Sequence, residues 1–180
     1  QAYIRNYPKG RYIIEARFQV GHCYYLNVAD ARLDQTDTKK GIEFFTQFVE
    51  YYPDSPYAEQ AYKEMGELYD NLAYKEYLNA KLYYNLGTYL GNNYLSAEIV
   101  AKNALKDYPY TSMREELSIL ILRARCKMAH NSIEEKKNER YRETIDEYYA
   151  FKTEFPDSKY MKEADALFKE AMDYVKDNKQ

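Results

Sequence analysis

The sequence predicts an all-α protein: a right-handed solenoid of about seven to eight helices, stacked as hairpins in a single domain over residues 1–180. The first observation is a repeat, because an aromatic residue precedes proline at Tyr7-Pro8, Tyr52-Pro53, Tyr108-Pro109 and Phe155-Pro156. The second is that apolar residues recur at helical spacing on both sides of each pair. The third is that 180 residues include only 6 glycines and 5 prolines, and no long strand-like alternation.

An amphipathic helix is predicted after each proline, because apolar residues recur there every fourth position and stay near one helix face. Four residues after the prolines come Tyr12, Tyr57, Met113 and Tyr160. Eight residues after them come Ala16, Ala61, Leu117 and Ala164. Twelve residues after them come Val20, Met65, Ile121 and Phe168. Three polar signals are expected to start these helices. They are Ser55 with Pro56 at the first helical position, Ser112 with Glu115 as a capping box, and Ser158.

Two of these helices carry a glycine followed three residues later by a tyrosine, at Gly21/Tyr24 and Gly66/Tyr69. We expect the small residue to let a neighbouring helix come close and the tyrosine to fill the space beside it.

A second kind of helix precedes each proline, which cannot continue a helix because it lacks the N–H. Apolar residues at helical spacing predict such helices over 38–52, 94–108 and 141–155. The closing helix is expected over 160–175. Its water-facing residues should be Lys162, Lys169, Asp173 and Lys176, as the end of a solenoid requires.

The longest repeat, from Pro53 to Pro109, predicts one long helix near 57–90. Two apolar stripes run through it, and the helical phase slips between them near 73–77. One helix of about 30 residues, roughly 50 Å long, explains both stripes, with its front half in one hairpin and its rear half in the next. The alternative is a short break at Asp70-Asn71.

Charge and apolar runs limit the function classes. The formal net charge is −3, and neither half of the chain is basic, so no nucleic-acid partner is expected. The basic residues of 136–142 alternate with glutamates and indicate a solvated, ion-paired helix face. No apolar run approaches the roughly 20 residues needed to cross a membrane.

No catalytic, cofactor-binding or metal-binding residue is predicted. The sequence shows no Ser/His/Asp set and no glycine-rich phosphate loop, and its carboxylates have ordinary helix-surface or capping roles available. His22 and His130 lack the neighbouring His or Cys that a zinc site needs. Cys23 and Cys126 are expected to be small core fillers.

Two groups of four stand out among the 23 tyrosines. Those at stripe spacing are expected in the core: Tyr24, Tyr69, Tyr83 and Tyr148. Off-stripe tyrosines are candidates for a groove that holds an extended peptide or a partner edge strand: Tyr25, Tyr74, Tyr77 and Tyr94. A purely structural role for the second group is the alternative.

The repeat resembles the tetratricopeptide repeat (TPR) over nearly the whole chain. The glycine–tyrosine pairs match the first helix of that repeat, and Ala97, Ala104 and Pro109 match its second helix. The helix after each proline is about three residues longer than in the standard repeat. Such repeats serve many partners, so this resemblance predicts fold more than function.

Several segments also resemble the BamD family of outer-membrane protein assembly lipoproteins. They are Leu33-Asp34-Gln35, Tyr52-Pro53-Asp54-Ser55, Leu72-Ala73-Tyr74-Lys75-Glu76-Tyr77 with Ala80 and Tyr83-Tyr84, Leu105-Lys106-Asp107-Tyr108-Pro109, and the final Phe155-Pro156-Asp157-Ser158. The resemblance implies a non-enzymatic adaptor, lipid-anchored at the periplasmic face of the outer membrane. Its implied partners are a POTRA domain of the barrel-forming subunit BamA, unfolded outer-membrane β-barrel proteins and other assembly lipoproteins. The chain begins with Gln1, so we expect an excerpt whose N-terminal repeats, signal peptide and lipidated cysteine precede it.

In that family an arginine contacts BamA nine residues before the proline that corresponds to Pro109. In this chain Val100 occupies that position. The resemblance therefore implies that Lys102 or Lys106 rebuilds the contact, or that docking differs. The candidate partner-binding residues are Tyr74, Lys75, Tyr77, Tyr94, Lys102 and Lys106. The alternative function is a generic periplasmic or cytoplasmic TPR adaptor, or an aromatic-groove module of the cell envelope that binds peptide or glycan.

Overall fold

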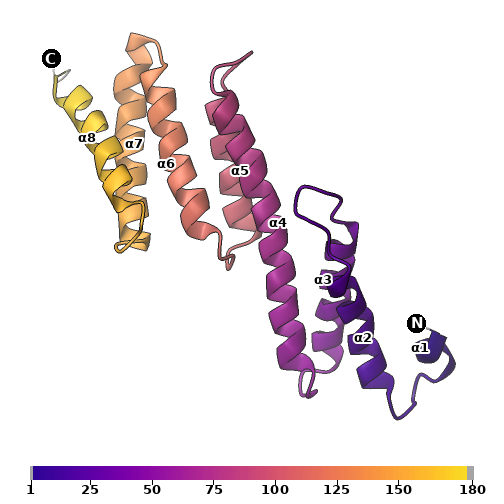
Figure 1. Cartoon of the computed structure of the whole chain (residues 1–180). Helices are drawn as coiled ribbons and strands as arrows, with labels where there is room; N and C mark the ends of the chain where they lie inside the picture. Colours follow the sequence, from indigo (N-terminus) through magenta and orange to yellow (C-terminus); the bar gives the residue numbers. More distant parts are fainter. Residues whose placement is uncertain (1, 178–180) are drawn as a thin grey trace. The chain divides into compact units, whose positions relative to one another are not determined.

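A computed structural model describes residues 2–177, which form eight α-helices and no strand (Figure 1). The helices are α1 (Ala2–Asn6), α2 (Ile13–Leu26), α3 (Thr36–Tyr51), α4 (Ala58–Leu86), α5 (Asn93–Asp107), α6 (Arg114–His130), α7 (Glu134–Glu154) and α8 (Met161–Asp177). They pack sequentially as hairpins, which confirms the all-helical fold class. The chain divides into two compact units, Gln1–Lys75 (unit 1) and Glu76–Gln180 (unit 2). The single domain over 1–180 stays a prediction.

The aromatic–proline pair defines the same junction four times. The odd-numbered helices α1, α3, α5 and α7 each end at the residue before the aromatic, and the even-numbered helices each begin five residues after the proline. The backbone N–H of Tyr52, Tyr108 and Phe155 donates to the carbonyl four residues earlier at 2.8–2.9 Å, and this bond closes the helix. Proline then prevents the next helical bond.

A short turn separates each proline from the next helix. The hydroxyls of Ser55, Thr111 and Ser158, two residues after proline, accept hydrogen bonds from backbone N–H groups two residues further on, at 2.9–3.2 Å. The helices therefore start later than predicted, and Pro56 lies in the turn.

The predicted capping box at Ser112 and Glu115 is wrong. The N-cap of α6 is Met113, and the Glu115 carboxylate accepts a hydrogen bond from the Ser158 hydroxyl of the next junction.

Aromatic rings fill the core of unit 1. Phe18 of α2 stacks on Tyr57 with 5.1 Å between ring centroids, and it contacts Phe45 and Phe48 of α3 at 5.9 and 5.8 Å. Leu68 joins this core from the front half of α4.

Gly21 and Gly66 occupy equivalent repeat positions, but only one has the predicted role. Gly21 is buried, and a Cβ added there would lie 2.7 Å from two carbons of the Phe45 ring. Gly66 is exposed, and no atom apart from the nearby backbone of its own helix lies within 4 Å of the position where its Cβ would be. The expectation of a close helix approach is therefore confirmed at Gly21 and wrong at Gly66.

The long helix is α4, which runs unbroken from Ala58 to Leu86, so the alternative break at Asp70-Asn71 is wrong. Ala61 and Leu68 belong to the core of unit 1, whereas Ala80 belongs to a core of unit 2. As predicted, the front and rear halves of this helix join different hairpins. The helix ends at Gly87, whose φ of +57° is the left-handed conformation that glycine adopts without strain.

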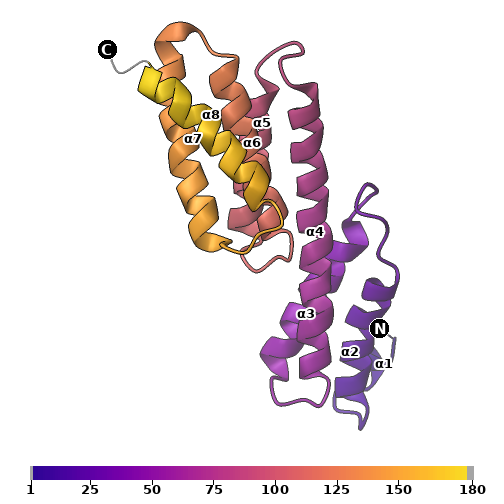
Figure 2. The ribbon, with the colours of Figure 1, turned by 60° about the vertical axis from the view of Figure 1, so that its left-hand side comes forward.

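Unit 2 is built around α6, which packs against α5 on one side and against α7 and α8 on the other (Figure 2). Ten residues of α6 are buried. One is Cys126, whose pKa is raised to about 12 by burial, so its thiol is the predicted core filler. Cys23 on α2 is exposed, and the same expectation is wrong for it.

The exposure of individual side chains tests the predicted core tyrosines and the predicted water-facing residues of α8. Tyr148 is buried in the core of unit 2, whereas Tyr69 and Tyr83 are 37% and 38% exposed and are not core residues as expected. The four predicted water-facing residues of α8 are all exposed. No helix within residues 2–177 has the length and hydropathy that a membrane crossing requires.

We predict opposite effects of alanine at the two glycines. Gly66→Ala should stabilise unit 1 by about 0.5–1 kcal/mol, because alanine restricts the unfolded chain and meets open space. Gly21→Ala should give unit 1 a lower free energy of unfolding than Gly66→Ala does, because overpacking against Phe45 costs about 1–3 kcal/mol. Urea unfolding followed by circular dichroism measures both, and equal effects of the two substitutions would contradict this packing.

Candidate functional site

The outward face of α5 carries an apolar pair followed by two lysines. Leu95 and Ile99 are 45% and 49% exposed, and Lys102 and Lys106 are exposed further along the same face. Steps of four, three and four residues place the four side chains in one row along the helix. We call these four residues the α5 face. The opposite side of α5 is anchored by the alanines 97, 101 and 104, which are almost fully buried.

Val100 does not belong to this face. Its side chain packs against the buried cluster that includes Ala80, Ala104 and Leu117. Because the side chain of Val100 packs into the core of unit 2, a partner that binds α5 has to contact the residues of the α5 face instead.

A partly buried charge cluster lies beneath Lys102. The Lys102 ammonium is 2.6 Å from the carboxylate of Glu98, one turn earlier on α5. The Arg125 guanidinium of α6 donates to the same carboxylate at 2.9 Å and pairs with Glu147 of α7 at 3.1 Å. Arg125 also donates to the backbone carbonyl of Glu143 at 3.0 Å. One guanidinium therefore links α5, α6 and α7 and fixes the acid that positions Lys102.

Burial dominates the electrostatics of this cluster. It raises the pKa of Glu147, and the nearby Arg125 only partly opposes that shift. Glu98 is 7% exposed. Since a buried acid is costly without a partner, Arg125 is important to both carboxylates: it pairs with Glu147 and shares Glu98 with Lys102. The cluster holds α5, α6 and α7 together and leaves the Lys102 ammonium accessible on the α5 face.

The other sequence-predicted candidates do not join the α5 face. Tyr74 and Lys75 lie on α4 in unit 1, where the Lys75 ammonium donates to the carbonyl of Leu33 at 2.8 Å. Tyr77 packs against the same core as Val100. Tyr94 contacts the Tyr84 ring edge-on at 5.6 Å and closes over Gly87. Of the six candidates, the structure brings together Lys102 and Lys106.

Sequence reasoning missed Leu95 and Ile99. Their signal was present, because they repeat at i and i+4 on α5, two positions before Ala97 and Ala101 of the alanine row. That spacing alone also fits a core stripe, and only the burial of the alanines separates the two faces of this helix.

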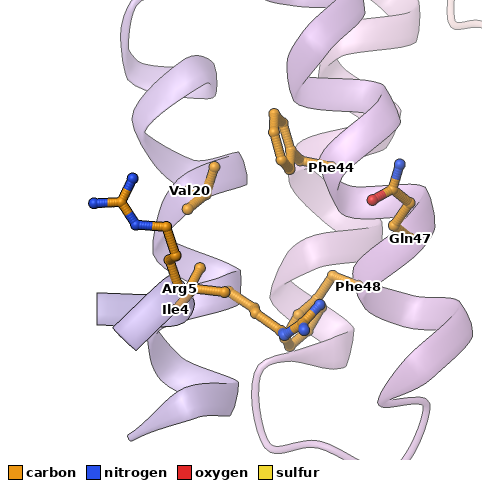
Figure 3. A pocket seen from close by; sticks show the side chains of 7 residues that line it. Ile4, Arg5, Val20, Phe44, Gln47 and Phe48 are labelled. Carbon is orange, nitrogen blue, oxygen red and sulfur yellow. The ribbon is translucent and has the colours of Figure 1, made fainter. Parts of the chain in front are cut away.

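Unit 1 has a cavity of about 350 Å³ among α1, α2 and α3, with Val20, Phe44 and Phe48 along it (Figure 3). A second cavity on α2 is lined by Ala16, Gln19, Val20, Cys23, Tyr24 and Asn27. One repeat later, the same positions on α4 are Ala61, Glu64, Met65, Leu68, Tyr69 and Leu72.

That equivalent α4 face packs against the hairpin of α2 and α3. Ala61 and Leu68 lie in the shared core, and Glu64 pairs with His22 of α2 at 2.8 Å. The α2 face with its cavities therefore has the form that receives a neighbouring helical hairpin. Within residues 2–177, no group of three or more histidine, cysteine or acidic side chains is placed to hold a metal ion.

Comparison with known proteins gives one match. The family model YfiO, described as an outer membrane lipoprotein, matches residues 1–138. This range covers α1 to α6, the start of α7 and the whole α5 face. Among curated proteins, no significant match is found.

We predict that Arg125→Met destabilises unit 2 much more than Arg114→Met, although both arginines bridge α6 and α7. Removing Arg125 leaves the partly buried Glu147 without its arginine and the buried Glu98 with Lys102 alone, and should cost about 3 kcal/mol. Arg114 pairs with the more exposed Glu154 and should cost at most about 1 kcal/mol.

Urea unfolding at neutral pH and near pH 5 measures the two penalties. Because burial raises the Glu147 pKa, this acid takes up a proton in the folded state before it does so in the unfolded chain. The Arg125→Met penalty should therefore shrink at the lower pH. A penalty that is equal for the two arginines, or independent of pH, would contradict the role given to Arg125.

Proposed function

Because the chain belongs to the YfiO family of outer membrane lipoproteins, the BamD family that its sequence resembles, we propose that it docks a POTRA domain of a BamA-type barrel-forming subunit through the α5 face. Family membership implies a role as a non-catalytic assembly lipoprotein of the outer membrane. Unfolded β-barrel proteins and other assembly lipoproteins are further proposed partners. The proposed location is the periplasmic face of the outer membrane, with a lipid anchor.

The observation that carries the proposal is the row of two exposed apolar residues and two lysines on one helix. Protein interfaces combine an apolar centre with a polar rim. Leu95 and Ile99 supply such a centre, and Lys102 and Lys106 supply a cationic rim. An acidic side chain of the partner could approach either ammonium, because Lys102 keeps 44% of its side-chain surface exposed beside Glu98.

The α5 face supports a docking mode that does not need an arginine at position 100. Val100 packs into the core of unit 2, so the positive charge has to come from elsewhere on α5. Lys102 is held in place by Glu98, which Arg125 fixes in turn. A positioned lysine loses less side-chain freedom on binding than a free one.

We predict that changes in the α5 face weaken binding to purified POTRA domains of BamA from the same cell. Ile99→Asp should raise the Kd about tenfold or more, because it places a charge in the apolar centre. Lys102→Glu with Lys106→Glu should raise the Kd several-fold near 0.05 M salt and less near 0.5 M salt, since exposed charges are screened. Isothermal titration calorimetry measures these changes.

The matched control is Lys162→Glu with Lys169→Glu, which reverses two exposed lysines on α8. This pair should leave the Kd unchanged. Absence of binding by the unaltered chain at tens of micromolar would favour a generic periplasmic adaptor with another partner. Equal effects of the two lysine pairs would show that total charge, and not the α5 face, sets the affinity.

A further inference from the structure

Five large apolar side chains are exposed where α4 ends and the loop to α5 begins. Leu82, Tyr89 and Leu90 are 58%, 67% and 90% exposed, and Tyr83 and Leu86 are 38% and 40% exposed. We call these five residues the tip. Neighbouring large apolar side chains that are exposed together mark a surface that meets another molecule.

The segment around the tip is nearly free of charge. Between residues 77 and 97 the only charged side chain is Lys81, although 31% of the chain is charged. The uncharged polar residues of this segment are tyrosine, asparagine, threonine and serine. A partner surface that meets the tip therefore need not offer a complementary charge, and it gains from covering apolar area.

The loop holds the tip in a fixed conformation. Leu90 has a φ of +54°, a left-handed conformation that is rare for a bulky residue. The backbone N–H of Tyr89 donates to the Leu86 carbonyl at 3.0 Å. The side-chain amide of Asn93 donates to the Tyr89 carbonyl at 2.6 Å. A strained backbone that keeps an apolar side chain in water indicates that the exposure serves a purpose.

The tip lies at the same end of unit 2 as the turn between α6 and α7, in both ribbon views (Figures 1 and 2). Ile133 of that turn is 64% exposed. Lys136 and Arg140 border a cavity together with Thr88 and other residues of the tip loop. This end of unit 2 thus combines exposed apolar side chains with the neighbouring cations Lys136 and Arg140. Glu135 and Glu139 lie in the same segment of α7 as these cations.

We propose that the tip contacts the surface of a lipid bilayer, with Tyr89 and Leu90 entering the region between headgroups and acyl chains. Tyrosine suits this region because its ring is apolar and its hydroxyl reaches water. Lys81 and Lys136 are exposed and can extend towards lipid phosphates while their stems stay near apolar groups. Arg140 donates to the Ser132 hydroxyl of the neighbouring turn. The acids beside these cations keep the local net charge small, so apolar contact and not charge attraction holds the tip.

A lipid surface fits the tip better than a protein groove does. The backbone N–H groups of Gly87, Tyr89, Gly91 and Asn93 already donate to carbonyls of the same segment, so a partner strand finds only part of the loop backbone to pair with. A bilayer accepts projecting apolar side chains without a complementary shape. The chain belongs to a family of outer membrane lipoproteins, which brings a bilayer within reach independently of POTRA docking.

The chain has no tryptophan, so a single introduced tryptophan reports on its own surroundings. Tyr89→Trp places the reporter in the tip. Tyr110→Trp places the control in the turn between α5 and α6, at the other end of α5, where Tyr110 is 99% exposed. Each variant is held on phosphatidylcholine vesicles, with or without phosphatidylglycerol, through an N-terminal hexahistidine tag and a nickel-chelating lipid.

The emission of Tyr89→Trp should shift to the blue, and lipids with brominated acyl chains should quench it several-fold more than the emission of Tyr110→Trp. The difference should persist near 1 M salt, where the screening length falls to about 3 Å. Adding Leu86→Asp and Leu90→Asp to Tyr89→Trp should abolish it, while both variants keep the helical circular dichroism of the unaltered chain.

Three results would overturn the proposal. They are equal quenching of the two reporters, no quenching of either reporter, and quenching that survives the two aspartates. Protection of the Tyr89→Trp reporter by a POTRA domain in place of vesicles would identify the tip as a protein contact. POTRA binding is measured separately, so failure of the lipid contact leaves the α5 face to its own test.

Discussion

The aromatic–proline junction is the constraint on which this fold depends. Proline removes one backbone donor and blocks the helix that precedes it, while the aromatic residue closes that helix with its own N–H. The next helix begins five residues after proline in all four copies. Because both ends of every connection are fixed, the faces of the helices are fixed as well. The position of Leu95, Ile99, Lys102 and Lys106 on the outside of α5 follows from where α5 starts and ends.

Contacts across the repeat then hold neighbouring hairpins together. In unit 1, His22 pairs with Glu64 and the Tyr25 hydroxyl donates to Glu67, both 42 residues away. In unit 2, Arg123 pairs with Glu163 at 2.6 Å across 40 residues. These contacts join one even-numbered helix to the next. Most lie at the edge of the apolar cores, so they set the register more than they add stability.

The junctions and the long helix could be predicted from sequence because their causes are local. Proline, helical periodicity and the phase slip near 73–77 act over a few residues. Side-chain neighbours were harder to predict. Gly21 and Gly66 share a repeat position, yet only Gly21 faces an aromatic ring. Tyr83 has core spacing but is exposed, whereas its neighbour Tyr84 packs against the core of unit 2. Lys102 was a candidate by its place on α5, whereas its link to Arg125 required the fold.

Docking through the α5 face requires that this face touches the partner directly. A photo-crosslinking amino acid at position 99, with the same amino acid at exposed position 166 of α8 as control, tests this claim in cells. We expect ultraviolet light to link position 99 to a POTRA domain of the barrel-forming subunit and to leave position 166 unlinked. Crosslinks from position 166 alone, or from neither position while the complex is intact, would contradict it.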